Sequence, residues 1–265
     1  MDNKLKKGIY IIPTLFTCGN MTCGYLSVIS SINGNFTKAA WLIMLAISFD
    51  MMDGRIARLT KSTSEFGIQV DSLSDLLSFG VAPSVMMYQL ILHTMGKIGL
   101  AIGVLFVLCS AFRLAKFNIK VNSNNMYYNP FMGLPTPASA GLLISFILSY
   151  ELFVSDSSRY LTYKTIPIFM KNMPIFLKKI MPIVMIILSF LMVSNIPYTS
   201  FKNLKLSKPK VLKFLVLIIL ILSLIIVFPQ NVIFVLFSMY ILLGIFSYLA
   251  KFWKILVRKR LRHED

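Results

Sequence analysis

Long apolar runs recur along the chain and are separated by shorter polar stretches. Each run has about 17–25 residues, the length that crosses the hydrocarbon core of a bilayer as a helix. The pattern therefore predicts an all-α fold, a polytopic integral membrane bundle of about eight transmembrane helices. The expected helices cover residues 12–31, 38–58, 68–92, 97–117, 135–154, 173–196, 211–229 and 231–250.

The first five runs differ from the last three in the polar residues that they contain. Gly, Ser, Thr, Asn and Asp interrupt the first five, whereas a run such as Val211–Phe228 is almost wholly aliphatic. A polar group in a membrane helix is costly unless it faces a partner or a cavity. We therefore expect a functional core in residues 1–154, and further transmembrane helices with a basic tail in 155–265 of the same membrane domain.

Composition and charge support a membrane protein and indicate its orientation. Hydrophobic residues make up 57% of the chain, charged residues make up 14%, and the net charge is +17. Most Lys and Arg residues fall in segments on the same side as the N-terminus when eight crossings are drawn. Since cytoplasmic loops are rich in these residues, both termini are expected in the cytoplasm. The basic residues follow loops and form no single stripe, so nucleic acid is not an expected partner.

Acidic residues are rare but concentrated. Five of the ten lie between Asp50 and Asp75. At about 100° per residue, Asp50 and Asp53 share one face of the second helix, and Asp71 and Asp75 share one face of the third. The short link at 59–66 makes these helices antiparallel neighbours, so the four carboxylates converge.

An ionised Asp at the centre of a membrane helix costs about 2.5–3.5 kcal/mol on insertion scales, so the cluster needs compensation. Carboxylate oxygens at this density suit Mg²⁺ or Mn²⁺. Two other interpretations remain: a salt-bridge cluster with Arg55, Arg58 and Lys61, and a site that transports divalent cations. The chain's two histidines, His93 and His263, fall outside these helices, so we expect chemistry without a histidine base.

The spacing of these residues resembles a family signature. The chain reads Asp50-Met-Met-Asp53-Gly54-Arg-Ile-Ala57-Arg58, then eight residues, Gly67, three residues, Asp71, three residues and Asp75. This is similar to the signature of the CDP-alcohol phosphatidyltransferases. The resemblance implies that Asp50, Asp53, Asp71 and Asp75 hold two divalent cations, Mg²⁺ or Mn²⁺, and that Asp75 is the catalytic general base. It also implies that Gly54, Ala57, Arg58 and Gly67 bind the CDP-lipid.

Three further stretches resemble the phosphatidylserine synthases, one branch of this family: residues 71–84, 110–118 and 131–140. The implied reaction transfers the phosphatidyl group from CDP-diacylglycerol to L-serine and releases CMP. Other acceptors, such as glycerol 3-phosphate, an inositol compound or choline, remain alternatives. The resemblance further implies a homodimer in the plasma membrane, with the active site facing the cytoplasm.

The candidate residues for serine binding are Arg113, Asn118 and Ser78. Arg113 is the best partner for a carboxylate, and a snorkelling interfacial residue is an equally good interpretation. For Asn118 and Ser78, capping or helix–helix contact is as good an interpretation as serine binding. Thr17, Asn20 and Thr22 could line the site or hold helices together.

Overall fold

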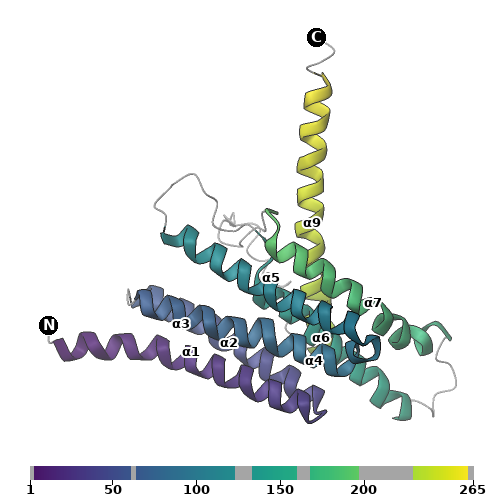
Figure 1. The fold of residues 1–265 in the computed structure, drawn as a ribbon, viewed down its shortest axis with the longest axis horizontal. Coiled ribbons are helices and arrows are strands. Elements are labelled where there is room, and N and C mark those ends of the chain that lie inside the picture. Colours follow the sequence, from purple (N-terminus) through teal and green to yellow (C-terminus); the bar gives the residue numbers. More distant parts are fainter. Residues whose placement is uncertain (1–2, 61–63, 123–132, 160–167, 197–228, 262–265) are drawn as a thin grey trace, which may run out of the picture.

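The computed structural model describes residues 3–60, 64–122, 133–159, 168–196 and 229–261, and no strand occurs among them (Figure 1). The prediction of an all-α fold is therefore confirmed for the described residues. Their elements are α1 (Asn3–Ile32), α2 (Phe36–Leu59), α3 (Glu65–Asp75), the π-helical η1 (Leu76–Val81), α4 (Ala82–Leu90), the short 3₁₀ element η2 (Leu92–Met95), α5 (Lys97–Asn122), α6 (Thr136–Arg159), α7 (Ile168–Val193) and α9 (Pro229–Leu261).

Helices α1 and α2 form a tight antiparallel pair. Gly34 ends the first helix with a φ of 76°, a left-handed conformation that glycine adopts without strain. The amide of Asn35 donates to the carbonyl of Ser30, 2.9 Å away, and closes the turn. Small residues let the helices approach closely: the Ser27 hydroxyl donates to the carbonyl of Ala39 at 2.9 Å. As a result α1 packs along α2 and also reaches α3, η1 and α4.

The predicted third transmembrane helix is a continuous helical path with a change of winding inside it. It begins at Glu65, where the Ser64 side chain accepts a hydrogen bond from the amide of Gly67 at 3.0 Å and caps the helix. Directly after Asp75 the path widens into the π-helical element η1, and α4 continues from Ala82. Short π-helical segments occur frequently at functional sites. The extra residue per turn changes the face on which the following side chains lie.

The C-terminal helices follow the predicted order. Helices α6, α7 and α9 correspond to the fifth, sixth and eighth predicted spans, and the predicted span 211–229 lies almost entirely outside the described residues. The far part of α9 projects away from the other helices (Figure 1). Two stretches among the described residues are long and apolar enough to cross a membrane, Lys97–Ile119 and Asn231–Tyr248.

The apolar core lies between α2, α4, α5, α6 and α7. Ile43, Met86, Phe106, Leu143 and Met185 are among its fully buried side chains. Polar residues of α1, α2 and α3 lie together beside this core, toward the C-terminal end of α2 and the C-terminal half of α3. The packed helices therefore hold fixed the elements that carry the aspartates.

Candidate active site

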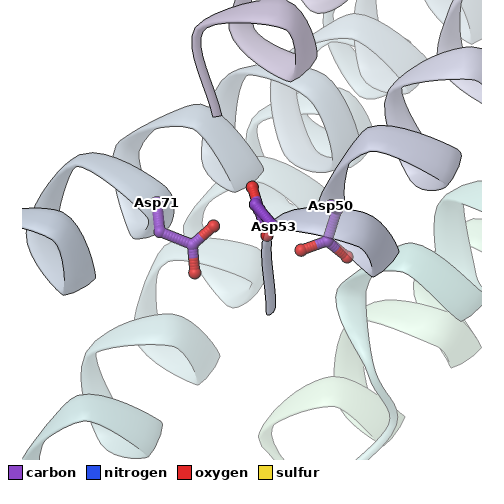
Figure 2. A group of neighbouring side chains, drawn as sticks. All are labelled: Asp50, Asp53 and Asp71. Carbon is purple, nitrogen blue, oxygen red and sulfur yellow. The ribbon is translucent and has the colours of Figure 1, made fainter. Parts of the chain in front are cut away.

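Three carboxylates from two helices converge on one point. Asp50 and Asp53 lie one turn apart on α2, Asp71 lies on α3, and one oxygen from each lies within 4.8 Å of the others. Figure 2 shows the three side chains turned toward one another. Asp53 is buried, and Asp50 and Asp71 are half-buried. The helical spacing predicts a convergence of four carboxylates, and the structure brings three of them to this point.

Asp75 lies beside this cluster and is not part of the group within 4.8 Å. It is buried, and the charges of Asp50 and Asp71 act on it. The side-chain amide of Asn20 donates to Asp75 Oδ1 at 3.2 Å. The backbone carbonyl of Asn20 in turn accepts from the hydroxyl of Ser78 at 2.9 Å. Asp75 is thus oriented by α1 as well as by its own helix.

Thr17 makes the same kind of contact one turn earlier on α1. Its hydroxyl lies 3.1 Å from Asp53 Oδ2 and 3.1 Å from the carbonyl of Pro13, and its own carbonyl accepts from the Ser74 hydroxyl at 3.1 Å. Thr17 and Asn20 therefore each contact one aspartate through the side chain and one serine through the backbone. Thr22 instead bonds to the carbonyl of Cys18 in its own helix.

A cavity of about 180 Å³ opens next to the carboxylates. The four residues that the family signature connects with the CDP-lipid all line it, together with Asp53 and Asp71. The remaining lining residues come from the start of α3 and from α1. The complete lining is Pro13, Thr14, Thr17, Asp53, Gly54, Ala57, Arg58, Ser64, Gly67, Ile68 and Asp71.

The glycines of the cavity have different surroundings. A Cβ atom built on Gly54 would meet no atom within 4 Å, so the missing side chain leaves open space in the cavity wall. A Cβ atom on Gly67 would lie 3.0 Å from Ser64 Oγ, at the cap of α3. Arg58 donates its Nε–H to the carbonyl of Gly54 at 2.7 Å, which leaves the two terminal nitrogens of its guanidinium to face other groups.

The three candidate residues for acceptor binding contact different helices. Arg113 donates to Thr136 Oγ1 at 2.8 Å. Asn118 donates to Ser72 Oγ on α3 at 2.8 Å. Ser78 is fully buried against α1. Asn118 and Ser78 thus both take part in helix–helix contacts.

The cluster is suited to hard cations. All its donors are carboxylate oxygens, and Asp71 Oδ1 is buried without a hydrogen-bond partner among the described residues. Among the described residues, neither Arg55 nor Arg58 forms a salt bridge with it, while the charge of Arg113 acts on Asp50 and Asp75. Arg58 binds a backbone carbonyl, Arg55 is exposed, and Lys61 lies outside the described residues. The structure thus favours a binding site over a salt-bridge cluster.

Comparison with known proteins identifies the family. The sequence profile of CDP-alcohol phosphatidyltransferases matches residues 10–170, and this chain belongs to that family. It is 36% identical over 251 residues to a CDP-diacylglycerol–serine O-phosphatidyltransferase of Helicobacter pylori, covering 95% of this chain and 96% of the relative. It is also 37% identical over 151 residues to an archaetidylserine synthase of Methanothermobacter thermautotrophicus, covering 56% of this chain and 63% of that protein. A serine O-phosphatidyltransferase of Bacillus subtilis is 34% identical over 140 residues, which are 53% of this chain and 77% of the relative.

Proposed function

We propose that this enzyme transfers the phosphatidyl group of CDP-diacylglycerol to the hydroxyl of L-serine and releases CMP. The observation that carries the proposal is the convergence of Asp50, Asp53 and Asp71 at the edge of a cavity lined by Gly54 and Arg58. The relatives named for transfer to serine support the choice of acceptor. The hydroxyl oxygen of serine attacks the phosphorus of the phosphatidyl group, and the bond from that phosphorus to the CMP oxygen breaks.

The CDP part of the lipid occupies the cavity. Gly54 lets the nucleotide approach the backbone of α2 closely, and Ala57 and Gly67 keep the remaining wall low. Arg58 donates its terminal N–H groups to a phosphate, which a planar guanidinium binds in a bidentate way. The N-terminus of α3 reaches the cavity through Ser64 and Gly67, and its partial positive charge favours the diphosphate.

Asp50, Asp53, Asp71 and Asp75 would hold two divalent cations, Mg²⁺ or Mn²⁺. When bound, such ions neutralise the charge of the diphosphate and align the reacting groups. The protein's contribution is to keep the carboxylates in place before the substrates arrive. Thr17 and Asn20 do this for Asp53 and Asp75 through hydrogen bonds of 3.1 and 3.2 Å.

Asp75 accepts the proton of the serine hydroxyl as the new bond forms. It stands one turn beyond Asp71, next to the cluster, and its Oδ1 is occupied by Asn20. This leaves Oδ2 to take the proton. The carboxylate of serine binds Arg113. Asn118 and Ser78 would contribute to this pocket through the helices they join, Asn118 linking α5 to α3 and Ser78 linking η1 to α1.

The membrane arrangement belongs to the same proposal. The enzyme lies in the plasma membrane, where eight helices cross the bilayer. Both termini and the active site face the cytoplasm, and two copies form a homodimer. Residues 1–154 form the catalytic core, and residues 155–265 complete the same membrane domain. The two long apolar stretches in α5 and α9 support the crossing of a bilayer.

The proposal is tested by measuring CMP release from CDP-diacylglycerol by the purified protein in detergent micelles. L-Serine, glycerol 3-phosphate, inositol and choline are compared, each with and without Mg²⁺ or Mn²⁺, and Asp75→Asn is the control. We expect release that requires both serine and metal and disappears in the variant. Release with another alcohol would contradict the serine assignment and keep the chemistry. If no alcohol supports release while the protein carries divalent cations across vesicles, the transport interpretation replaces this one.

A further inference from the structure

The guanidinium of Arg113 is held on two sides. Nη1 donates to Thr136 Oγ1 at 2.8 Å, and the guanidinium carbon lies 5.7 Å from the ring centroid of Phe117, within the range of a cation–π contact. Its charge acts on Asp75 and Asp50 across the site. A guanidinium has five N–H donors, and one of them serves the bond to Thr136. The group is therefore oriented beside the carboxylates with capacity for a further anion.

Thr136 is itself fixed by the backbone around it. It is the first residue of α6, it is fully buried, and prolines stand on both sides of it. The segment before it is tied to the end of α7: the amide of Gly133 donates to the carbonyl of Ile196 at 2.9 Å, and the amide of Leu134 donates to the carbonyl of Leu191 at 3.0 Å. Gly133 has a φ of 88°, and a Cβ atom there would overlap the α7 backbone. The hydroxyl of Thr136 thus has one defined place.

A second contact joins α5 to the same end of α7. Lys116, one turn beyond Arg113, donates to the carbonyl of Val193 at 3.3 Å and to Asn195 Oδ1 at 2.7 Å. A lysine at the C-terminus of a helix satisfies its last carbonyls and its partial negative charge. Helices α5, α6 and α7 therefore meet in one junction, and the charge of Arg113 acts from it on Asp75 and Asp50. Helix α7, from the C-terminal part of the chain, thus contacts the end of α5 that carries Arg113.

We propose that Thr136 is a positioning residue that aims Arg113 at the carboxylate of the acceptor, so that the junction of α5, α6 and α7 determines which alcohol is used. The inference rests on the proposed function, because it takes Arg113 as the group that binds the acceptor. Thr136 acts through Arg113 and does not touch the reacting atoms. Loss of its hydroxyl should weaken binding of the acceptor and leave binding of the CDP-lipid unchanged.

The test compares full-length wild-type protein with Thr136→Val and Thr136→Ser. Valine keeps the shape and removes the hydroxyl, whereas serine keeps the hydroxyl. We measure the KM for L-serine, the KM for CDP-diacylglycerol and kcat by CMP release, and the thermal unfolding temperature of each protein. For Thr136→Val we expect the KM for serine to rise about tenfold, equivalent to about 1.4 kcal/mol, with the KM for CDP-diacylglycerol unchanged. Thr136→Ser should retain a KM for serine within about twofold of wild type, since the hydrogen bond to the guanidinium is kept.

An unchanged KM for serine in Thr136→Val would overturn the inference. The inference would also be overturned if Thr136→Val raised both KM values equally and lowered kcat and the unfolding temperature, and Thr136→Ser did not restore them. Such a result would describe a purely structural residue. If Thr136→Val does not fold, Thr136→Ala removes the hydroxyl without adding a group and decides between the same outcomes. Failure of the proposed function looks different: the wild type itself would then use an acceptor other than serine. Because glycerol 3-phosphate, inositol and choline have no carboxylate, that result would overturn this inference as well.

Discussion

Replacing Gly54 with alanine should stabilise the folded protein and impair its reaction. Gly54 lies inside α2, and a Cβ atom there would meet no atom within 4 Å. Alanine in a helix interior is more favourable than glycine by about 0.5–1 kcal/mol, because glycine loses more conformational freedom when the chain folds. With no contact to oppose this gain, the unfolding temperature should stay the same or rise.

The effect on catalysis has the opposite sign. The open space beside Gly54 belongs to the cavity that also contains Arg58 and Asp53. If the nucleotide of the CDP-lipid fills that space, a methyl group there costs about 1–3 kcal/mol, as overpacking does in a core. The KM for CDP-diacylglycerol should then rise roughly 5- to 150-fold. CMP release is measured against CDP-diacylglycerol concentration in mixed micelles at saturating serine.

Gly24→Ala provides a matched control on the neighbouring helix. A Cβ atom at Gly24 would overlap the Ser78 hydroxyl and lie 2.9 Å from the Ser78 Cα, so the backbone of η1 would have to move. We expect a loss of about 1–3 kcal/mol in stability and an unfolding temperature lower by about 2–4 °C for each kcal/mol. An unchanged KM for CDP-diacylglycerol in Gly54→Ala would refute the placement of the nucleotide, and full stability of Gly24→Ala would refute the close packing of α1 on η1.

Three further outcomes follow from the site. Asp71→Asn should lower metal-dependent CMP release at least about 100-fold. Mg²⁺ should raise the unfolding temperature of the wild type because it binds preferentially to the folded state, and it should raise that of Asp71→Asn less. Asn20→Ala should lower kcat about tenfold, the loss expected for one hydrogen bond to a charged group, with the KM for CDP-diacylglycerol unchanged. Lys116→Met should raise the KM for serine, and Lys116→Arg, which keeps a donor for Asn195, should retain more of the wild-type value; both are measured by CMP release.

The carboxylate cluster could be predicted from the sequence because it depends on short-range geometry. Asp50 and Asp53 are one helical turn apart, and a link of few residues brings Asp71 back beside them. The same regularity places Gly54 and Ala57 on the cavity side of α2. Wherever the chemistry lies on two consecutive helices, the helical period and the link length are enough to bring the side chains together.

The supporting contacts could not be predicted in the same way. Asn20 and Asp75 are 55 residues apart, and Lys116 and Asn195 are 79 residues apart. Such pairs depend on the crossing of helices that are distant in sequence, which periodicity does not define. The π-helical turn after Asp75 was likewise hidden, since its residues Leu76–Val81 read as an ordinary apolar helix segment. A face drawn at 100° per residue therefore does not hold through this segment.

The contacts divide the site into two supports that come from different helices. Helix α1 holds Asp53 and Asp75 through Thr17 and Asn20, while the junction of α5, α6 and α7 holds Arg113 through Thr136. The first support acts on aspartates that we propose hold the cations. The second acts on the group that we assign to the acceptor alone. We therefore expect a change at the junction to alter the choice of alcohol, and a change in α1 to affect the reaction with any alcohol.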